Sequence, residues 1–394
     1  MRKFHPLAVA AEKQGKKIYH LNIGQPDLAT PPAYFEAVRS FDKRTLAYDA
    51  SPGNPGLIEA IRRYYKRLDV DLDPRDILVT TGGSEALLLT CLSILDPYTE
   101  VIIPEPYYPN YTTFVHAAGG VIRALPTNPW EGYRYADRER IESLITPNTR
   151  AILITNPGNP TGVVLDESEM RMIADIAKKH NLFLICDEVY REFCYDDKFG
   201  VPTMARYRDI DENLVIVDSV SKRFSACGAR VGCVVTRNKQ LQAALLKFCQ
   251  SRLSVATVDQ VGAAALYSVD HAFFRQCKEE YRRRRDTVIG KLRKIPGVVV
   301  EEPMGAFYLM ASLPVDNSDK FQRWLLEEFS DNGDTVMFAP GAPFYETPGK
   351  GINEVRIAYV LKQQDLERAM DVLAKGIAVY QKTVMEVKAV PVEE

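Results

Sequence analysis

Ala151-Ile152-Leu153-Ile154-Thr155 is an apolar, β-rich run that leads directly into Asn156-Pro157-Gly158-Asn159-Pro160-Thr161-Gly162. The two X-Pro steps and two glycines stiffen a loop where the predicted strand ends. Ligands of α/β sheets bind at the carboxyl ends of strands, and the Asn159 amide would offer donors and an acceptor there. The alternative is a rigid turn that binds nothing.

Similar runs on both sides of this segment alternate with helix-like stretches. The strand candidates are residues 77–80, 101–104, 182–186, 214–219 and 231–235, and the helix candidates are 84–95, 111–118 and 167–179. Strands that are apolar on both faces and alternate with helices predict an α/β fold with a mostly parallel central sheet wrapped by helices.

The C-terminal third has a different pattern. Residues 270–294 read as one long charged helix, a plausible connector. A smaller α+β unit follows, with strands at 298–300, 306–310, 336–339 and 355–359, helices at 319–330 and 364–381, and a polar tail after about residue 386. The run Arg282–Arg285 lies in the connector. Because four successive helical residues point in all directions, we interpret it as a solvated, ion-paired surface and not as a nucleic-acid site.

Composition excludes several classes of protein. With 50 Lys and Arg against 52 Asp and Glu, the net charge is −2, which gives no overall attraction to nucleic acid or to an anionic membrane. The longest apolar runs are strand-sized, and the start of the chain has no apolar stretch typical of a secretory signal. Seven scattered cysteines without a CxxC pair, and histidines without metal spacing, predict a reduced, cytoplasmic protein with no metal site.

Two further stretches carry candidate chemistry. Thr81-Gly82-Gly83-Ser84 follows a predicted strand and opens a helix, where backbone N–H groups could hold an anion; the alternative is a tight turn capped by Ser84. Asp187 and Tyr190 follow another strand, so both could face a ligand, although Asp187 could equally be a helix N-cap.

The most informative stretch is Ser219-Val220-Ser221-Lys222, with Arg230 eight residues after the lysine. A second cation near a lysine disfavours the ammonium form, which makes Lys222 a candidate nucleophile. A surface lysine is the alternative. GxGxxG and GxxxxGK[ST] are both missing, so a nicotinamide dehydrogenase or an NTP-binding protein is disfavoured.

Taken in order, these motifs resemble the class I/II pyridoxal-5′-phosphate aminotransferases, the aspartate aminotransferase-like group of fold type I. The resemblance covers nearly the whole chain: residues 22–27, Tyr48 with Gly53, 81–86, 104–108, 156–162, 187–190, 219–230, 305–308, 340–341 and 354–357. It implies a seven-stranded-type central sheet. It also implies an N-terminal arm with part of a small domain at 1–45, a large cofactor-binding domain at 46–285, and a C-terminal small domain at 286–394.

The resemblance also implies roles for single residues. Lys222 matches the lysine that forms the internal aldimine with pyridoxal 5′-phosphate and then shuttles the substrate proton. Asp187 matches the partner of the pyridine nitrogen, and Tyr190 and Asn159 match the residues that bind the ring 3′ oxygen. The remaining cofactor-binding residues are Gly83, Ser84, Ser219 and Arg230 at the phosphate, Tyr108 stacked on the ring, and Tyr48 and Ser254 at the phosphate of a partner subunit.

For the substrate, Arg356 matches the arginine that binds the α-carboxylate, and Gly24 a loop glycine that closes over it. An arginine within a strand pattern is unusual for a structural residue, although a buried ion pair is the alternative. Two departures concern substrate choice. Tyr108 stands where aspartate-specific members typically carry tryptophan. Gln250 stands where animal-type aspartate enzymes carry a second arginine, and Arg252, two residues on, resembles an arginine of alanine-type members.

The sequence therefore predicts a homodimeric aminotransferase that moves an amino group from an L-amino acid, with aspartate and alanine favoured, to a 2-oxo acid such as 2-oxoglutarate. A β-lyase or decarboxylase of the same fold is the alternative within the family. A non-catalytic regulator domain that binds pyridoxal phosphate is the alternative from another class.

Overall fold

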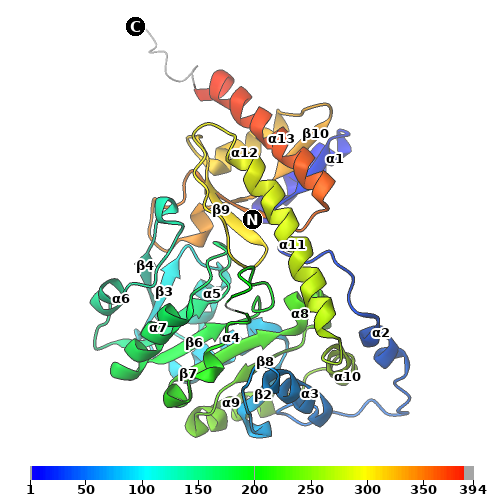
Figure 1. Cartoon of the computed structure of the whole chain (residues 1–394), viewed down its shortest axis with the longest axis vertical. Helices are drawn as coiled ribbons and strands as arrows, with labels where there is room; N and C mark the ends of the chain where they lie inside the picture. The colour runs from blue at the N-terminus through cyan, green and yellow to red at the C-terminus, as the bar shows by residue number, and fades with distance from the viewer. Residues whose placement is uncertain (1, 199, 386–394) are drawn as a thin grey trace.

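A seven-stranded sheet forms the larger part of the molecule (Figure 1). In this computed structural model, which describes residues 2–198 and 200–385, the strand order is β2-β8-β7-β6-β5-β3-β4. The bounds are β2 Ile77–Thr80, β3 Glu100–Glu105, β4 Val121–Pro126, β5 Thr149–Thr155, β6 Phe183–Asp187, β7 Leu214–Ser219 and β8 Gly232–Val235. Only β8 pairs antiparallel, with β2 and β7, so the prediction of a mostly parallel sheet is confirmed.

Helices cover both faces of this sheet because successive strand residues point to opposite sides. In β7, Val215 and Val217 pack with α4, α5 and α9, whereas Ile216 packs with α3, α7 and α10. These helices are α3 Pro55–Lys66, α4 Gly82–Ile94, α5 Asn110–Ala117, α7 Glu167–Lys179, α9 Lys239–Arg252 and α10 Thr257–Leu266, with the shorter α6 Arg138–Ser143 and α8 Val220–Arg223 between them. An Asp166–Glu169 capping box starts α7 at the residue that the sequence predicts.

The smaller part joins the two ends of the described chain. Strand β1 (Lys17–His20) pairs in parallel with β10 (Asp334–Met337). A separate antiparallel sheet has the order β11-β12-β9, with bounds β9 Tyr308–Ser312, β11 Ala339–Pro340 and β12 Glu354–Ala358. The helices of this part are α1 His5–Lys13, α12 Ser318–Glu327 and α13 Gln363–Tyr380; α2 Pro32–Arg39 lies against α10. The predicted strand at 298–300 is wrong: Val299 makes a single bridge to Ser312, flanked by Gly297 and Pro303.

Helix α11 (His271–Leu292) runs from the large part to the smaller one as a continuous connector (Figure 1). It packs on both, and this corrects the interpretation of its arginine run. All four arginines are ion-paired as expected, but the side chains of Arg284 and Arg285 are only 3% and 8% exposed. A helix enclosed on two sides has too little free circumference to leave four consecutive residues in solvent.

The predicted domain boundaries at 45/46 and 285/286 stay a prediction. Residue 1 and residues 386–394, which include the predicted polar tail, lie outside the described residues. Among the helices that the structure describes, none combines the length and the apolar character needed to cross a bilayer.

Candidate active site

The carboxyl ends of β5, β6 and β7 open into a cavity of about 460 Å³, closed on its other side by the smaller part. This is the edge at which α/β sheets bind ligands. Of the residues predicted for the site, all except Tyr48 and Ser254 line this cavity. They are Gly24, Gly83, Ser84, Tyr108, Asn159, Asp187, Tyr190, Ser219, Lys222, Arg230 and Arg356.

Lys222 extends into the cavity from α8, directly after β7. Its Nζ donates to the backbone oxygen of Gly24 at 2.8 Å and lies 3.9 Å from Cys227 Sγ. Ser219 caps α8 by accepting a hydrogen bond from the Ser221 N–H, which fixes the turn that aims the lysine. Lys222 is half-buried in the cavity wall and is not an ordinary surface lysine.

Asp187 is the last residue of β6 and is only 6% exposed. Its Oδ2 accepts from Tyr111 Oη at 2.6 Å, and its Oδ1 from the Val189 N–H at 3.3 Å. Turns follow Asp187 in place of a helix, so it caps none. Burial raises the pKa of Asp187 to about 6, and the Tyr111 hydrogen bond opposes that rise. A buried carboxyl held by neutral donors is suited to a cationic partner.

A hydrogen-bonded row joins the two sides of the cavity. Asn159 Nδ2 donates to Tyr190 Oη at 3.4 Å, and Tyr190 Oη lies 3.0 Å from Tyr308 Oη. Arg356, on β12, donates from Nη1 to Asn159 Oδ1 at 3.2 Å and stacks 4.6 Å from the Tyr308 ring. Burial raises the pKa of Tyr190, so its phenol stays a neutral hydrogen-bonding group.

A second cluster at the cavity floor is built for an anion. Helix α4 begins at Gly82, so the N–H groups of its first turn, at Gly83 and Ser84, have no intrahelical carbonyl. Ser84 therefore lies inside the first turn and is not the cap. Gly82 has φ +74°, which favours glycine, and a Cβ there would lie 2.6 Å from Arg230 Nη2, so a side chain at 82 would displace this cation from its present position.

This donor set fits pyridoxal 5′-phosphate. The α4 N-terminus, Ser219 and Arg230 suit a dianionic phosphate, and buried Asp187 suits a protonated ring nitrogen. Lys222 supplies an amine, and Tyr190 with Asn159 supplies hydrogen-bonding groups beside it. These residues can therefore hold the phosphate, ring and carbonyl groups of the cofactor at once.

Three predicted residues lie elsewhere. Tyr48 is 80% exposed, and Ser254 Oγ accepts from the Asp49 N–H at 3.3 Å, outside the cavity. Arg252 donates from Nη2 to Val79 O at 2.9 Å and pairs with Glu85 at 3.4 Å. It connects Glu85 of α4 to Val79 of β2, so in this structure Arg252 has a structural role and does not face the cavity.

The sequence interpretation missed some lining residues. Tyr111 was only the start of a predicted helix, yet it holds Asp187. Tyr308 appeared only as one residue of the stretch 305–308. For Tyr111 the available signal was its place one helical turn after Tyr108, just beyond strand β3. For Tyr308 no local signal exists, because its partners are distant in sequence.

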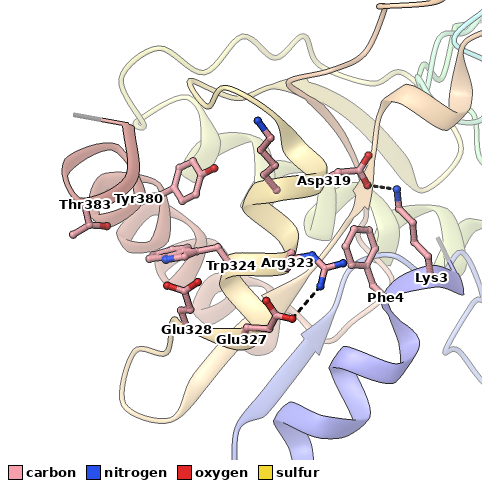
Figure 2. A pocket seen from close by; sticks show the side chains of 10 residues that line it. Lys3, Phe4, Asp319, Arg323, Trp324, Glu327, Glu328, Tyr380 and Thr383 are labelled. Atoms are coloured by element: carbon pink, nitrogen blue, oxygen red, sulfur yellow. Dashed lines mark hydrogen bonds and ion pairs between the residues drawn. The ribbon is translucent and has the colours of Figure 1, made fainter. Parts of the chain in front are cut away.

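A second hollow is a groove of about 560 Å³ among η1 (Arg2–Phe4), α12 and α13 (Figure 2). Phe4, Trp324 and Tyr380 give it apolar walls. Its rim charges pair with each other, Lys3 with Asp319 at 2.6 Å and Arg323 with Glu327 at 3.1 Å. None of the predicted site residues lines this groove.

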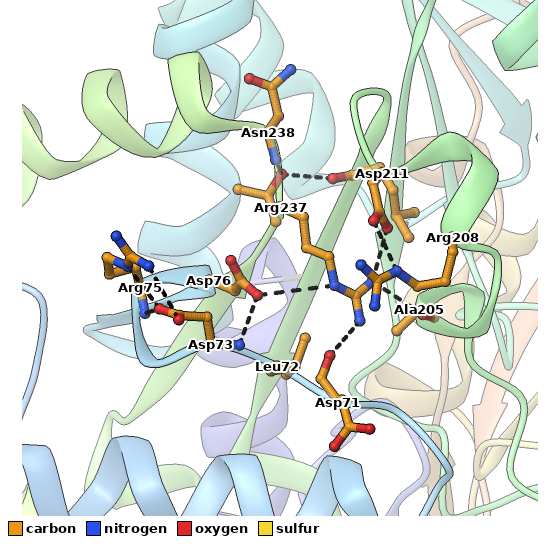
Figure 3. A network of polar contacts seen from close by, with 12 residues as sticks. Asp71, Leu72, Asp73, Arg75, Asp76, Ala205, Arg208, Asp211, Arg237 and Asn238 are labelled. Atoms are coloured by element: carbon orange, nitrogen blue, oxygen red, sulfur yellow. Dashed lines mark hydrogen bonds and ion pairs between the residues drawn. The ribbon is translucent and has the colours of Figure 1, made fainter.

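A polar cluster also lies at the opposite edge of the large sheet, where β2 and β7 begin (Figure 3). Arg237, just after β8, donates to Asp211 Oδ1 at 2.9 Å and to Asp71 O at 2.7 Å. It also pairs with Asp76 of η2 (Pro74–Asp76) at 3.9 Å. We call Arg237, Asp76 and Asp211 the Arg237 cluster.

Comparison with known proteins agrees with this geometry. Residues 16–373 match the family model described as aminotransferase class I and II. Aspartate aminotransferase of Pyrococcus horikoshii is 32% identical over 366 residues, which covers 91% of this chain and 90% of that protein. Aspartate/prephenate aminotransferase of Thermus thermophilus is 30% identical and covers 93% of both chains. The solved alanine aminotransferase of Pyrococcus furiosus superimposes with a TM-score of 0.87 at 29% identity, over 96% of both chains.

Proposed function

The chain belongs to the class I and II aminotransferase family and is a pyridoxal-phosphate-dependent transaminase, and from this premise we propose that it moves the amino group of aspartate to 2-oxoglutarate through the cavity built on Lys222. The single observation that carries the residue assignment is the convergence of Lys222, Asp187, Arg230 and Arg356 on one cavity. Four charged groups from four separate segments meet there around space for one small molecule.

The large-sheet side would hold the cofactor. Gly83, Ser84, Ser219 and Arg230 would bind its phosphate, Asp187 its ring nitrogen and Tyr190 with Asn159 its 3′ oxygen, and Tyr108 would stack on its ring. When bound, pyridoxal phosphate supplies an electron sink for the bond broken at the substrate Cα. Asp187 contributes a buried negative charge, which is worth more in a desolvated site than in water.

Lys222 moves the proton. Its Nζ is the basic group that extends into the space between the two halves of the cavity. We assign it the transfer of the Cα proton, which requires the amine to be neutral and within hydrogen-bonding reach of Cα. The Gly24 carbonyl holds Nζ in this position when substrate is absent.

Arg356 binds the α-carboxylate that every amino acid and 2-oxo acid shares. Its guanidinium offers a planar fork, and its Nη2 now donates to the backbone oxygen of Asn22 at 2.8 Å. We propose that the carboxylate replaces this carbonyl oxygen. The exchange would orient Cα–H toward Lys222.

The choice of aspartate rests on the aspartate aminotransferases among the relatives. Alanine is the second candidate, for a specific reason: the cations that line the cavity are Lys222, Arg230 and Arg356. These three are assigned to cofactor and α-carboxylate. Among the described residues, Arg252 does not add a fourth cation to the cavity, so a distal carboxylate would depend on a partner subunit.

We further propose a cytoplasmic homodimer. Leu46, Tyr48 and Leu253 are 65%, 80% and 49% exposed, and Ser254 follows directly, so an apolar patch lies beside residues that resemble those of a shared site. Sedimentation should give about twice the 44.4 kDa chain mass. A fully active monomer would contradict the shared site.

A substrate panel tests the proposed reaction. The holoenzyme is mixed with each of twenty amino acids, and the half-reaction is followed by the change in cofactor absorbance. Aspartate, with alanine next, should react fastest, and 2-oxoglutarate should restore the starting spectrum. Release of ammonia or CO₂ without any 2-oxo acid would favour a β-lyase or decarboxylase instead.

A further inference from the structure

Arg284 is the buried member of the arginine run on α11. Its guanidinium donates from Nη1 to Asp27 Oδ1 at 2.6 Å and from Nη2 to Asp27 Oδ2 at 3.3 Å. Nη1 also donates to Val360 O at 2.7 Å, and Nε to Glu280 Oε1 at 2.8 Å. One side chain thus joins its own helix, through Glu280, to two distant segments of the chain.

These two segments belong to the cavity wall. Asp27 directly follows residues 22–26, which we call the arch; Asn22, Ile23, Gly24 and Gln25 of the arch line the cavity. Val360 lies just beyond β12, the strand that carries Arg356. Arg284 therefore joins the end of the arch to the end of the Arg356 strand.

The other end of the arch is fastened by backbone bonds. Leu21 accepts from the Ala358 N–H at 2.8 Å and donates to Met337 O at 2.7 Å. Between these bonds and Arg284, the arch spans five residues. The attachment at the Asp27 end is made by side chains, so substitutions can weaken it without touching the backbone bonds at Leu21.

The position of the arch matters for both charged groups of the site. Asn22 O accepts from Arg356 Nη2, and Gly24 O accepts from Lys222 Nζ at 2.8 Å and from Tyr308 Oη at 3.1 Å. A Cβ on Gly24 would lie 1.9 Å from Tyr308 Oη, so the arch already touches the wall. Movement of the arch by a few tenths of an ångström would change what Arg356 and Lys222 contact.

We infer that Arg284, through its two-pronged bond to Asp27, is a positioning residue that holds the arch over the cavity and so sets the affinity for the substrate carboxylate. This inference rests on the proposed roles of Arg356 and Lys222. Arginine suits the task because its fork binds both carboxylate oxygens, which the point charge of lysine cannot do.

The experiment compares four variants of the holoenzyme. Asp27→Asn keeps the shape and removes the charge; Arg284→Lys keeps the charge and removes the fork; Arg284→Met removes both. Arg283→Met is the matched control, because Arg283 is the neighbouring arginine, 57% exposed and paired with Glu280 on its own helix. KM and kcat are measured for aspartate and for 2-oxoglutarate, together with cofactor absorbance.

Asp27→Asn and Arg284→Lys should each raise both KM values about tenfold, the size expected for a lost charge-assisted bond, with kcat changed less than about threefold. Cofactor absorbance should be unchanged, because its holders lie on the large sheet. Combining Asp27→Asn with Arg284→Lys should add little to either single change. Arg283→Met should stay within about twofold of the parent in every parameter.

Amide hydrogen exchange gives a readout that does not depend on activity. In Asp27→Asn, amides of residues 22–25 should exchange faster, while those of β5, β6 and β7 keep their rates. Unchanged KM values in Asp27→Asn and Arg284→Lys would overturn the inference, as would additive effects of the pair. If Arg284→Met does not fold, Asp27→Asn decides. If no amino acid reacts, the proposed function fails, while the exchange of residues 22–25 still decides the anchoring role.

Discussion

The two edges of the seven-stranded sheet differ in where their charged groups lie relative to the cavity. At the edge where β2 and β7 begin, the Arg237 cluster pairs its guanidinium with Asp76, Asp211 and two backbone oxygens (Figure 3). At the other edge, Lys222 and Arg356 bond neutral oxygens of the chain, and Asp187 bonds neutral donors. A cation that is paired with an acid stabilises the fold. A charged group that is bonded only to neutral groups can exchange those partners for a charged ligand. The cavity edge also contains a buried network in which Asp218 of β7 pairs with Arg191 and Arg223. Ion pairs therefore occur at both edges, and the functional edge is distinguished by the charged groups, such as Lys222 and Asp187, that line a cavity.

The largest expected loss of activity follows from Lys222→Ala at the ligand-binding edge. Removing the amine removes the base that moves the Cα proton, so transamination should fall by about 10³-fold or more. The visible absorption of cofactor joined to the lysine should also disappear. Stopped-flow spectra and steady-state rates measure both. Turnover near that of the parent protein would remove Lys222 from the mechanism.

Arg356→Ala should come next. It removes a fork that binds a group common to all substrates, at a cost of about 2–5 kcal/mol, or roughly 30-fold to several-thousand-fold in kcat/KM for alanine and aspartate alike. Arg252→Ala is the control, because Arg252 bonds to Val79 and Glu85 outside the cavity. It should leave the ratio of the two kcat/KM values unchanged. A selective loss with aspartate would instead make Arg252 the reader of a distal carboxylate.

Asp187 should make cofactor binding depend on pH. In the cofactor-free protein its pKa is about 6, raised mainly by burial, so the carboxyl loses its charge as the pH falls through 6. Cofactor affinity should therefore weaken between pH 7.5 and pH 5, more in the parent than in Asp187→Asn. Fluorescence titration at several pH values measures this.

The raised pKa of Asp187 also makes the stability of the cofactor-free protein depend on pH. Stability should fall as the pH rises, whereas cofactor affinity should increase. The folded-state pKa is higher than the unfolded value near 3.9, so burial of the ionised Asp187 carboxyl lowers the free energy of unfolding. This loss of stability is absent below pH 4 and grows up to about pH 7. Cofactor-free Asp187→Asn should then be about 2–3 kcal/mol more stable than the parent at pH 8 and equal to it at pH 4. Denaturant unfolding that showed no such crossover would place the pKa of Asp187 near its ordinary value.

The smallest effect on catalysis belongs to the other edge. Arg237→Met should lower the free energy of unfolding by about 1–3 kcal/mol, since it leaves Asp76 and Asp211 without their shared cation. KM and kcat should stay within about twofold. A large kinetic change without a change in stability would show that the two edges are coupled.

The central sheet and most of the residues that line its cavity could be predicted from sequence, because strands such as residues 77–80 and 214–219 are apolar on both faces and end in polar motifs. The ligand-facing residues at strand ends were accessible for the same reason. The features that could not be predicted depend on contacts between residues far apart in the sequence. The Tyr111 phenol holds Asp187, 76 residues away, and Arg284 holds Asp27, 257 residues away. Strand β1 forms only because β10 lies beside it. Sequence periodicity reports burial, but not which distant segment causes it.

The contact between Gly82 and Arg230 limits how this protein can vary in evolution. The anion-binding capacity of the cavity floor depends on an atom that is missing, because a Cβ at position 82 would lie 2.6 Å from Arg230 Nη2 and the end of that side chain would have to move. The backbone adds a second restriction, since the φ of +74° at Gly82 strains any residue that has a side chain. Replacement of Gly82 should therefore lower cofactor affinity even though glycine has no side chain to contact the phosphate. A shorter residue at 230 would relieve the contact but not the backbone strain, so a change at 82 keeps a cost in either background.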